Sequence, residues 1–274
     1  IKFFIKETIR LSEKKRIKKL KLSEKIIDYF LEHIIRNKIK AIFGGKLKTF
    51  ISGGAALDPD IGNFFLNMGC NILQGYGQTE AGPLISCNNL EENKTLTVGK
   101  PVKNVFVKIS SIGEILVKGE NVMKGYWKNQ KLTQETIKNN WLHTGDLGYF
   151  DEENRLIING RKKDLIVTSG GENISPQKIE NHLILHEEID QSVVFGDSKP
   201  YLVAIIVLKK NANKKIIKEK ISYTNKKLNT PEKIRKYFVI YDQFTYENGF
   251  LTQTLKIKRE KVFKFYKKQI NLLY

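Results

Sequence analysis

The sequence predicts an α/β part, followed by a small β-barrel and then by an α+β domain. Three observations support this order. A strand, a turn, a helix and a second strand follow one another within residues 48–74, which is typical of one unit of an α/β sheet. Short alternating strands separated by Gly and Asn turns occupy residues 97–158, as in a small all-β barrel. From residue 162 onward, helical and strand patterns are mixed.

We therefore expect three parts in the chain. They are a partial α/β portion of a larger domain at residues 1–96, a β-barrel subdomain at residues 97–161, and a hinge with a mobile α+β domain at residues 162–274. A length of 274 residues is enough for about two domains with buried cores. The chain starts with Ile1 rather than Met and shows no signal-like segment, so we expect an N-terminally truncated fold.

The individual elements of the first part follow from local patterns. Residues 1–40 alternate basic and apolar positions at helical period. Residues 48–52 predict a buried strand, and Asp58, which precedes a proline, predicts a helix start. Asn71–Gln74 predicts a second short strand that leads into a Gly-Tyr-Gly loop.

The middle and last parts have weaker but regular patterns. Three strands are predicted in the middle part: Val105–Ile109, Glu114–Lys118 and Leu156–Ile158. The last part should contain a helix at Ile179–Leu185, preceded by a cap near Ser175, with Pro176 in its first turn. Its predicted strands are Gln191–Phe195, Tyr201–Leu208 and Phe238–Tyr241, with a basic helical stretch between the last two. A terminal helix completes the chain, and the boundary between domains is expected at Arg161–Asp164.

The charge of the chain is strongly basic, with a formal net charge of +19. Lysines dominate, and at residues 14–25 and 209–227 they recur at helical intervals that predict solvated helix faces. We therefore disfavour a nucleic-acid-binding module, which would bind DNA or RNA with a steep salt dependence. An anionic membrane surface or a polyanionic ligand remains compatible with the excess of positive charge.

Several site classes are disfavoured by composition and spacing. No apolar run approaches the ~20 residues of a membrane span. Cys70 and Cys87 form neither a metal-ligand spacing nor a disulfide framework, which suits a reducing cytosol. His182 and His186 lie four apart on a predicted helix, but Leu183 stands where zinc proteases place a Glu. No Ser-His-Asp arrangement is indicated either.

Three motifs occur in a fixed order along the chain: Gln74-Gly-Tyr-Gly-Gln-Thr-Glu80, His143-Thr-Gly-Asp146-Leu-Gly148 and Gly160-Arg-Lys-Lys-Asp164. A carboxylate such as Asp146 can accept two hydrogen bonds from the vicinal hydroxyls of a ribose, and the fork of Arg161 can bind phosphate or ribose oxygen. Purely structural interpretations also exist, with Asp146 as a turn residue and Glu80 as an acid at a helix start.

Together with Gly44–Leu57, these motifs resemble those of adenylate-forming enzymes, specifically long-chain fatty acyl-CoA synthetases. The resemblance runs from about Arg36 to Arg259. Such enzymes join a fatty acid to AMP, using ATP and Mg²⁺, and then exchange AMP for coenzyme A. Their C-terminal domain swings about a hinge between the two half-reactions. The resemblance implies that this chain is a C-terminal portion of such a ligase and is insufficient for the reaction by itself.

The same resemblance assigns roles to individual residues. The implied ATP- and AMP-binding residues are Gly53, Gly54, Ala55, Gln74, Gly75, Tyr76, Gly77, Thr79, Asp146 and Arg161. Thr79 corresponds to a phosphate-side threonine. Glu80 corresponds to the magnesium-associated glutamate, since a hard cation prefers carboxylate oxygen.

Three further segments carry implied roles. Lys163 lies at the implied hinge, and Ser169, Gly170, Gly171 and Glu172 lie in a loop that faces coenzyme A. Lys256 takes the place of the catalytic lysine, whose ammonium would neutralise charge that grows on carboxylate and α-phosphate oxygens. The chain departs from many relatives at Leu255, where Gly is common, and at Gln253, where Pro is frequent.

The phosphate-binding loop and most of the acyl tunnel, which lie upstream in the family, are not found in this sequence. Two alternatives therefore stay open: an acyl-AMP ligase that supplies an acyl-carrier protein, and a non-catalytic nucleotide-binding fragment. We expect long-chain fatty acid, ATP and coenzyme A as binding partners, with no nucleic acid and no specific protein partner. The expected location is cytoplasmic, with peripheral membrane association left open. Acyl chain length and oligomeric state are not indicated.

Overall fold

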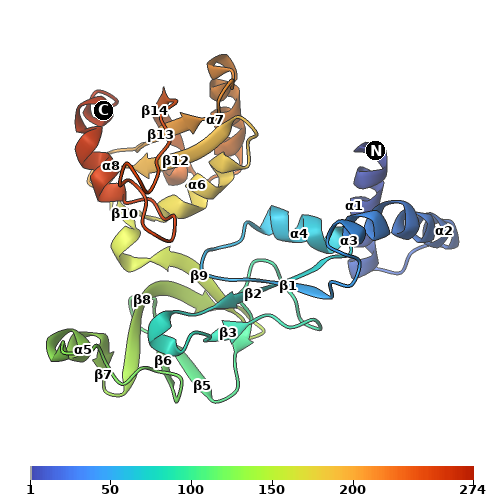
Figure 1. Ribbon diagram of the computed structural model, residues 1–274, viewed down its shortest axis with the longest axis horizontal. Helices are drawn as coiled ribbons and strands as arrows, with labels where there is room; N and C mark the ends of the chain where they lie inside the picture. Colours follow the sequence, from blue (N-terminus) through green and yellow to red (C-terminus); the bar gives the residue numbers. More distant parts are fainter. Residues whose placement is uncertain (1) are drawn as a thin grey trace. The chain divides into compact units, whose positions relative to one another are not determined.

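The computed structural model describes residues 2–274, which form two compact units that divide between Asn159 and Gly160 (Figure 1). The fold is mixed α/β with several separate sheets, as expected from the sequence. Each unit is described by itself below. The division into three parts stays a prediction.

The first unit begins with helices, as predicted for residues 1–40, of which Ile1 lies outside the described residues. They are α1 (Lys2–Ile17), α2 (Leu22–Leu31), a π-helical turn (Glu32–Arg36) and α3 (Asn37–Ile42). Leu11 of α1, Leu31 of α2 and Ile35 of the π-helical turn meet in one buried cluster, which Leu20 and Met68 complete.

A buried arginine organises the polar part of this helical region. The Arg36 guanidinium donates hydrogen bonds of 2.7 Å to both Asp28 Oδ1 and Ser12 Oγ, and one of 3.2 Å to the Asn67 carbonyl oxygen. Burial by itself raises the pKa of the Asp28 carboxyl, but the hydrogen bond and charge of Arg36 lower it overall. The guanidinium therefore ties α1 and α2 to Asn67, the last residue of the helix α4 (Pro59–Asn67).

A four-stranded sheet follows, in the order β1-β2-β3-β4. Its strands are β1 (Thr49–Ser52), β2 (Asn71–Tyr76), β3 (Ser86–Cys87) and β4 (Lys100–Pro101). β1 and β2 are parallel, in register from Thr49 with Asn71 to Ser52 with Gln74. The sequence placed Gly75 and Tyr76 in a loop, and this was wrong, because β2 continues through both residues and pairs there with β3.

The helix α4 (Pro59–Asn67) connects the two parallel strands. It begins as the sequence predicts, with the Asp58 carboxylate accepting hydrogen bonds from the backbone N–H groups of Asp60 and Ile61 at 2.8 and 3.3 Å. Pro59 occupies the first helical position, where its missing N–H has no cost.

The rest of the first unit is a five-stranded sheet with β5-β6-β8-β7 in line and β9 paired to β8. The strands are β5 (Val105–Ile109), β6 (Glu114–Gly119), β7 (Ile137–Lys138), β8 (Trp141–Phe150) and β9 (Leu156–Arg161), and the short helices are α5 (Gln130–Thr136) and the 3₁₀ turn η2 (Thr79–Ala81). The closure of this sheet into a barrel stays a prediction. The sequence did not indicate β8, so the interpretation of Asp146 as a turn residue was wrong.

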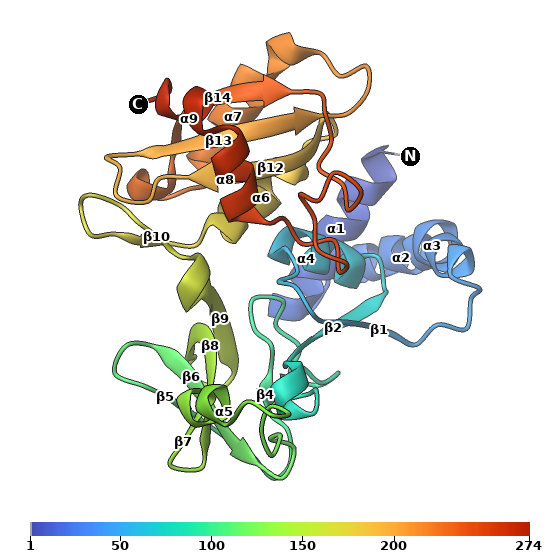
Figure 2. The same ribbon diagram turned by 60° about the vertical axis from the view of Figure 1, so that its left-hand side comes forward.

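The second unit is an α+β domain around one three-stranded sheet, in the order β12-β13-β14 (Figure 2). Its elements are 3₁₀ η3 (Lys162–Asp164), β10 (Ile166–Val167), β11 (Asn173–Ile174), α6 (Pro176–Ile184), β12 (Ile189–Phe195), β13 (Leu202–Leu208), 3₁₀ η4 (Lys214–Ile216), α7 (Ile217–Lys226), 3₁₀ η5 (Thr230–Glu232), β14 (Ile234–Ile240), α8 (Arg259–Phe265) and α9 (Lys267–Asn271). The predicted pairing of the strands now named β12 and β13 is confirmed and is antiparallel. Ser175 and Pro176 also start α6 as expected, although Ser175 makes no side-chain cap hydrogen bond.

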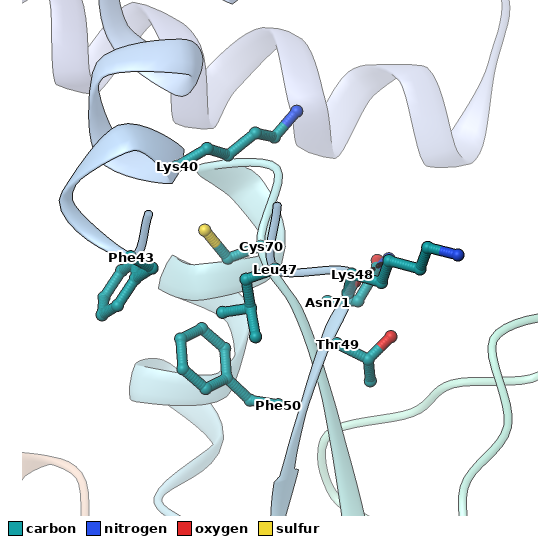
Figure 3. Close-up of a pocket in the computed structure, with 8 residues that line it drawn as sticks. All are labelled: Lys40, Phe43, Leu47, Lys48, Thr49, Phe50, Cys70 and Asn71. Atoms are coloured by element: carbon teal, nitrogen blue, oxygen red, sulfur yellow. Dashed lines mark hydrogen bonds between the residues drawn. The ribbon is translucent and has the colours of Figure 1, made fainter. Parts of the chain in front are cut away.

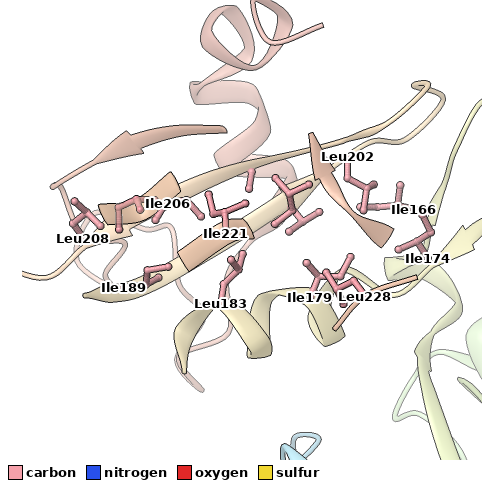
Figure 4. Close-up of a cluster of buried hydrophobic side chains, with 14 residues drawn as sticks. Ile166, Ile174, Ile179, Leu183, Ile189, Leu202, Ile206, Leu208, Ile221 and Leu228 are labelled. Carbon is pink, nitrogen blue, oxygen red and sulfur yellow. The ribbon is translucent and has the colours of Figure 1, made fainter. Parts of the chain in front are cut away.

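Both faces of this sheet are covered, which explains the unbroken apolar run of β13. Even-numbered positions such as Ala204 and Ile206 contact α6 and α7 (Figure 4). Odd-numbered positions such as Val203 and Ile205 contact α8, α9 and the segment that leads to them. Because side chains alternate along a strand, a strand with two buried faces must be apolar throughout. Within residues 2–274, no helix is both long and apolar enough to cross a membrane.

Candidate nucleotide site

The parallel strands β1 and β2 end side by side at the glycines that the resemblance assigns to the nucleotide. A Cβ placed on Gly53 would lie 3.5 Å from the Gly75 carbonyl oxygen, so the two backbones are close. Gly53, Gly54 and Ala55 are all exposed, and Gly54 has a φ of +81°. Ligands of open α/β sheets bind beyond the carboxyl ends of the strands. This edge is therefore an accessible place for a flat ring.

Two residues from different predicted motifs meet at the next position of β2. The Tyr76 hydroxyl donates a 2.7 Å hydrogen bond to Oδ2 of Asp146, which lies 70 residues further along the chain. Asp146 is only 5% exposed, whereas Tyr76 is half-buried. The structure thus brings together the tyrosine of the Gly-Tyr-Gly segment and the proposed ribose-binding carboxylate.

A β-bulge in β8 places Asp146 at this point. Glu114 of β6 pairs with Leu147, and Leu116 pairs with His143, so Ile115 alone faces three residues of β8. Gly145, in the middle of the bulge, has a φ of +72°, which favours glycine. Bulges commonly re-aim a side chain next to an active site.

Gln74 and Gly77, two of the predicted nucleotide-site residues, also have structural roles in the fold. The buried Gln74 side chain donates a 2.5 Å hydrogen bond to the Thr95 carbonyl and accepts one of 3.2 Å from the Leu57 backbone N–H. Its amide therefore connects loops around the sheet. A Cβ on Gly77 would lie 1.7 Å from the Pro83 carbonyl oxygen, so a side chain is excluded there by the fold itself. A direct contact of either residue with a nucleotide stays a prediction.

Thr79 and Glu80 lie in the short 3₁₀ turn η2, with Thr79 exposed and Glu80 half-buried. Oε1 of Glu80 accepts a 2.8 Å hydrogen bond from the Tyr126 hydroxyl. Burial, and then the hydrogen bond to Glu80, raise the pKa of Tyr126, so this phenol stays protonated and donates. Sequence reasoning missed Tyr126, whose only signal was an aromatic residue next to Gly125 in a polar loop.

The predicted residues of the second unit lie on exposed segments. Arg161 is at the end of β9, and Lys163 is in the 3₁₀ turn η3 that follows. A short irregular segment between two regular elements can absorb large backbone changes, as a hinge requires. The hinge role of Lys163 and the approach of Arg161 to a nucleotide stay predictions.

The segment assigned to coenzyme A is the loop of the β10-β11 hairpin. The Thr168 hydroxyl donates a short hydrogen bond to Oε2 of Glu172, and this bond lowers the pKa of the Glu172 carboxyl. Gly171, with a φ of +82°, turns the chain between them. Ser169 and Gly170 are exposed at the tip. The loop is held by these internal contacts and by the Ser169 N–H, which donates a 3.0 Å hydrogen bond to the Lys199 carbonyl outside the loop.

Lys256 lies in a tight exposed loop closed by an isolated bridge between Leu251 and Ile257. The Thr252 N–H donates to the Lys256 carbonyl at 2.8 Å, and the Lys256 N–H donates to Thr252 Oγ1 at 3.0 Å. Leu255, immediately before the lysine, has a φ of +59°. A left-handed backbone conformation at this position suits glycine better than leucine.

A small pocket lies elsewhere, between the end of α3 and the amino ends of β1 and β2 (Figure 3). Its lining residues are Lys40, Phe43, Leu47, Lys48, Thr49, Phe50, Cys70 and Asn71. It contains none of the predicted site residues, and it lies at the end of the parallel strands opposite to Gly53 and Gly75. We therefore do not assign the nucleotide to it.

The glycines at the strand ends and the Asp146 carboxylate, which Tyr76 joins, thus lie together as the prediction of a nucleotide site requires. The chain matches the family model described as AMP-binding enzyme over residues 3–127, and the model described as AMP-binding enzyme C-terminal domain over residues 163–274. The chain belongs to the AMP-binding, adenylate-forming enzyme family, as its motifs predict.

Within this family, the chain is similar to acyl-CoA ligases. It is 34% identical to the long-chain-fatty-acid–CoA ligase FadD15 of Mycobacterium tuberculosis, over 89% of this chain and 44% of that protein. It is 33% identical to the mouse long-chain-fatty-acid–CoA ligase 5, over 90% of this chain and 42% of that protein. The chain thus spans less than half the length of these relatives.

Solved structures agree with this assignment. O-succinylbenzoate coenzyme A synthetase from Bacillus subtilis, in complex with AMP, superimposes with a TM-score of 0.68 and 28% identity, over 83% of this chain and 49% of that one. The adenylation domain of the carboxylic acid reductase from Segniliparus rugosus matches 99% of this chain and 46% of that one, with a TM-score of 0.73. At 21% identity, the second match supports the fold alone.

Proposed function

We propose that this chain is the nucleotide- and coenzyme A-facing portion of an ATP-dependent long-chain fatty acid–CoA ligase. The observation that carries the proposal is the 2.7 Å hydrogen bond between Tyr76 and Asp146, because it joins two motifs of the family at one point. The 34% identity to a long-chain-fatty-acid–CoA ligase supports the substrate class.

In the proposed reaction, a carboxylate oxygen of the fatty acid attacks the α-phosphorus of ATP. The bond between that phosphorus and its bridging oxygen breaks, and pyrophosphate leaves. The coenzyme A thiolate then attacks the acyl carbonyl carbon, and AMP leaves. Asp146 would accept hydrogen bonds from the ribose hydroxyls, and Arg161 would bind ribose or phosphate oxygen. Lys256 would neutralise the charge that grows on the carboxylate and α-phosphate oxygens.

Glu80 and its surroundings fit a magnesium ion that is shared with a nucleotide. Residues 2–274 contain no cluster of three or more His, Cys, Asp or Glu side chains that could enclose a metal. Mg²⁺ in nucleotide sites is usually held by one or two carboxylates together with substrate phosphates. A single half-buried carboxylate, steadied on one oxygen by Tyr126, suits that arrangement. Bound magnesium would offset the negative charge of the triphosphate.

Binding of AMP to the chain tests the nucleotide site directly. A hydrogen bond to a charged group contributes about 1.5–3 kcal/mol, so Asp146→Ala should weaken AMP binding by roughly 10- to 150-fold in calorimetry. Glu152→Ala, which removes an exposed carboxylate outside the site, is the matched control and should leave the affinity unchanged. Equal affinities of the wild-type and Asp146→Ala chains would refute the ribose assignment.

The longer protein that contains this chain tests the reaction. Incubated with a long-chain fatty acid, ATP, Mg²⁺ and coenzyme A, it should form acyl-CoA and AMP, and Lys256→Ala should slow adenylation by about 10²–10³-fold. Acyl-AMP that is passed only to an acyl-carrier protein would favour the acyl-AMP ligase instead. AMP binding without any product would favour a non-catalytic nucleotide-binding protein. The cytoplasmic location and association with anionic membranes stay part of this proposal, and sedimentation with anionic vesicles tests the latter.

A further inference from the structure

Glu114 is a buried carboxylate at the start of a strand whose other buried residues are apolar. It is the first residue of β6, it is 8% exposed, and the next three residues are Ile, Leu and Val. Burying a charge is costly unless hydrogen-bond donors surround it. A glutamate at this position therefore needs hydrogen-bond donors nearby that offset the free-energy cost of its burial.

Its partners are the residues of the bulge that precede Asp146. Oε1 of Glu114 accepts a 3.1 Å hydrogen bond from the Gly145 backbone N–H. Oε2 lies 3.4 Å from Nδ1 of His143. The carboxylate thus accepts a hydrogen bond from a peptide N–H that the bulge has removed from the regular ladder. This N–H belongs to Gly145, the residue immediately before Asp146.

A second side chain completes the bulge. The Thr144 hydroxyl donates a 2.8 Å hydrogen bond to the Ile115 carbonyl and accepts one of 3.1 Å from the Asp146 N–H. Side chains of two residues therefore replace the missing backbone pairing on both sides of Gly145. Buried polar groups that are fully satisfied in this way fix one local conformation.

Without the bulge, the pairing would change in a definite way. Continuing the register from Leu116 and His143, a regular ladder would place Gly145 opposite Glu114. In the structure, Leu147 takes that place, a shift of two residues. Because side chains alternate with a period of two, this shift keeps the faces of the flanking residues and changes only the direction of the residues inside the bulge.

We propose that Glu114 is a positioning residue, which holds the Gly145 N–H so that the Asp146 carboxylate is directed at the ribose hydroxyls of the nucleotide. The proposal rests on the proposed function, because it takes Asp146 as the ribose ligand. Glu114 itself touches no nucleotide in this scheme. Its effect reaches the ligand through the backbone of the bulge.

The test compares two nucleotides in each variant by calorimetry with the full chain: AMP, and 2′,3′-dideoxy-AMP, which lacks both ribose hydroxyls. The wild-type chain should prefer AMP by at least about tenfold, as one charged hydrogen bond predicts. In Glu114→Ala the preference should fall below about threefold. General destabilisation would weaken both nucleotides alike, so the ratio reports the direction of Asp146 rather than stability.

Two conservative variants keep the test decisive if Glu114→Ala does not fold. Glu114→Asp keeps the charge but is one methylene shorter, so it should lose contact with the Gly145 N–H and lose the preference. Glu114→Gln keeps an acceptor oxygen at the same reach and should retain the preference, and its loss there would overturn the acceptor role. Glu152→Ala serves again as the control and should behave as the wild type.

The outcomes separate this proposal from the one on which it rests. If the wild-type chain binds both nucleotides equally, the ribose role of Asp146 is wrong, and the role of Glu114 fails with it. If Asp146→Ala abolishes the preference while Glu114→Ala and Glu114→Asp retain it, the proposed function stands and only the positioning role of Glu114 is overturned.

Discussion

The contact between Arg259 and Glu180 gives a quantitative prediction, because within the second unit it fastens the end of the Lys256 segment to α6 and β12. The guanidinium donates two hydrogen bonds to the Glu180 carboxylate, at 2.6 and 3.0 Å, and a third of 2.7 Å to the Val194 carbonyl. The side chains are 28% and 14% exposed. Oε1 of Glu180 also accepts a 2.7 Å bond from the Val194 N–H.

The magnitude follows from this geometry. An exposed ion pair contributes about 0–1 kcal/mol, whereas removing one partner of a fully buried pair costs roughly 3–5 kcal/mol. The pair of Arg259 and Glu180 lies between these limits and is bidentate. We therefore expect Arg259→Ala to lower the free energy of unfolding of the second unit by about 2–3 kcal/mol. The coupling free energy between Arg259→Ala and Glu180→Ala should be about 1–2 kcal/mol.

Native-state hydrogen exchange of the β13 backbone amides is a suitable assay, since every residue of that strand is buried. Trp fluorescence is unsuitable, because Trp127 and Trp141 both belong to the first unit. Lys178→Ala is the matched control. Lys178 lies on α6, like Glu180, but is exposed and pairs with Glu232, so its removal should lower the free energy of unfolding by less than about 1 kcal/mol. A coupling free energy below about 0.3 kcal/mol would refute the anchoring role.

Two further predictions concern local stability. Leu255→Gly should stabilise the second unit by about 1 kcal/mol, because Leu255 has a φ of +59°; a lower melting temperature would contradict this. Glu24 forms a 2.5 Å hydrogen bond with Lys14, and this bond, followed by that of the Lys21 N–H, lowers the pKa of Glu24 from 4.5 to about 2. Because the folded pKa is the lower one, its stabilisation should be present above pH 4.5 and be lost as the pH falls toward 2. Glu24→Gln should remove this part of the pH dependence of the free energy of unfolding. If the loss of stability between pH 4.5 and 2 were the same in the variant and the wild type, Glu24 would have no role in it.

Elements with strong local patterns could be predicted from the sequence. The capped helix after Asp58 could be predicted from the side-chain oxygen of Asp58 and the proline that follows it. The pairing of β12 with β13 could be predicted from the unbroken apolar run of β13. The strand β8 was missed because a Thr-Gly-Asp stretch has the composition of a turn. Its strand conformation depends on β6, from which Glu114 and the Ile115 carbonyl supply the missing hydrogen-bond partners. Such tertiary partners leave no local pattern.

The candidate site shows the same division between what a sequence indicates and what only a structure can supply. Asp146 and Glu80 were selected because their motifs resemble those of the family, and because carboxylates suit ribose hydroxyls and magnesium. Each carboxylate is held by a tyrosine that is distant in the sequence. Tyr76 donates a 2.7 Å hydrogen bond to Asp146, 70 residues away, and Tyr126 donates one of 2.8 Å to Glu80, 46 residues away. A carboxylate that must meet a ligand in one orientation needs such a second contact, because its own rotamers would otherwise be free. Residues that position the ligand-binding groups should therefore be sought outside the motifs as well, among buried polar side chains such as Glu114.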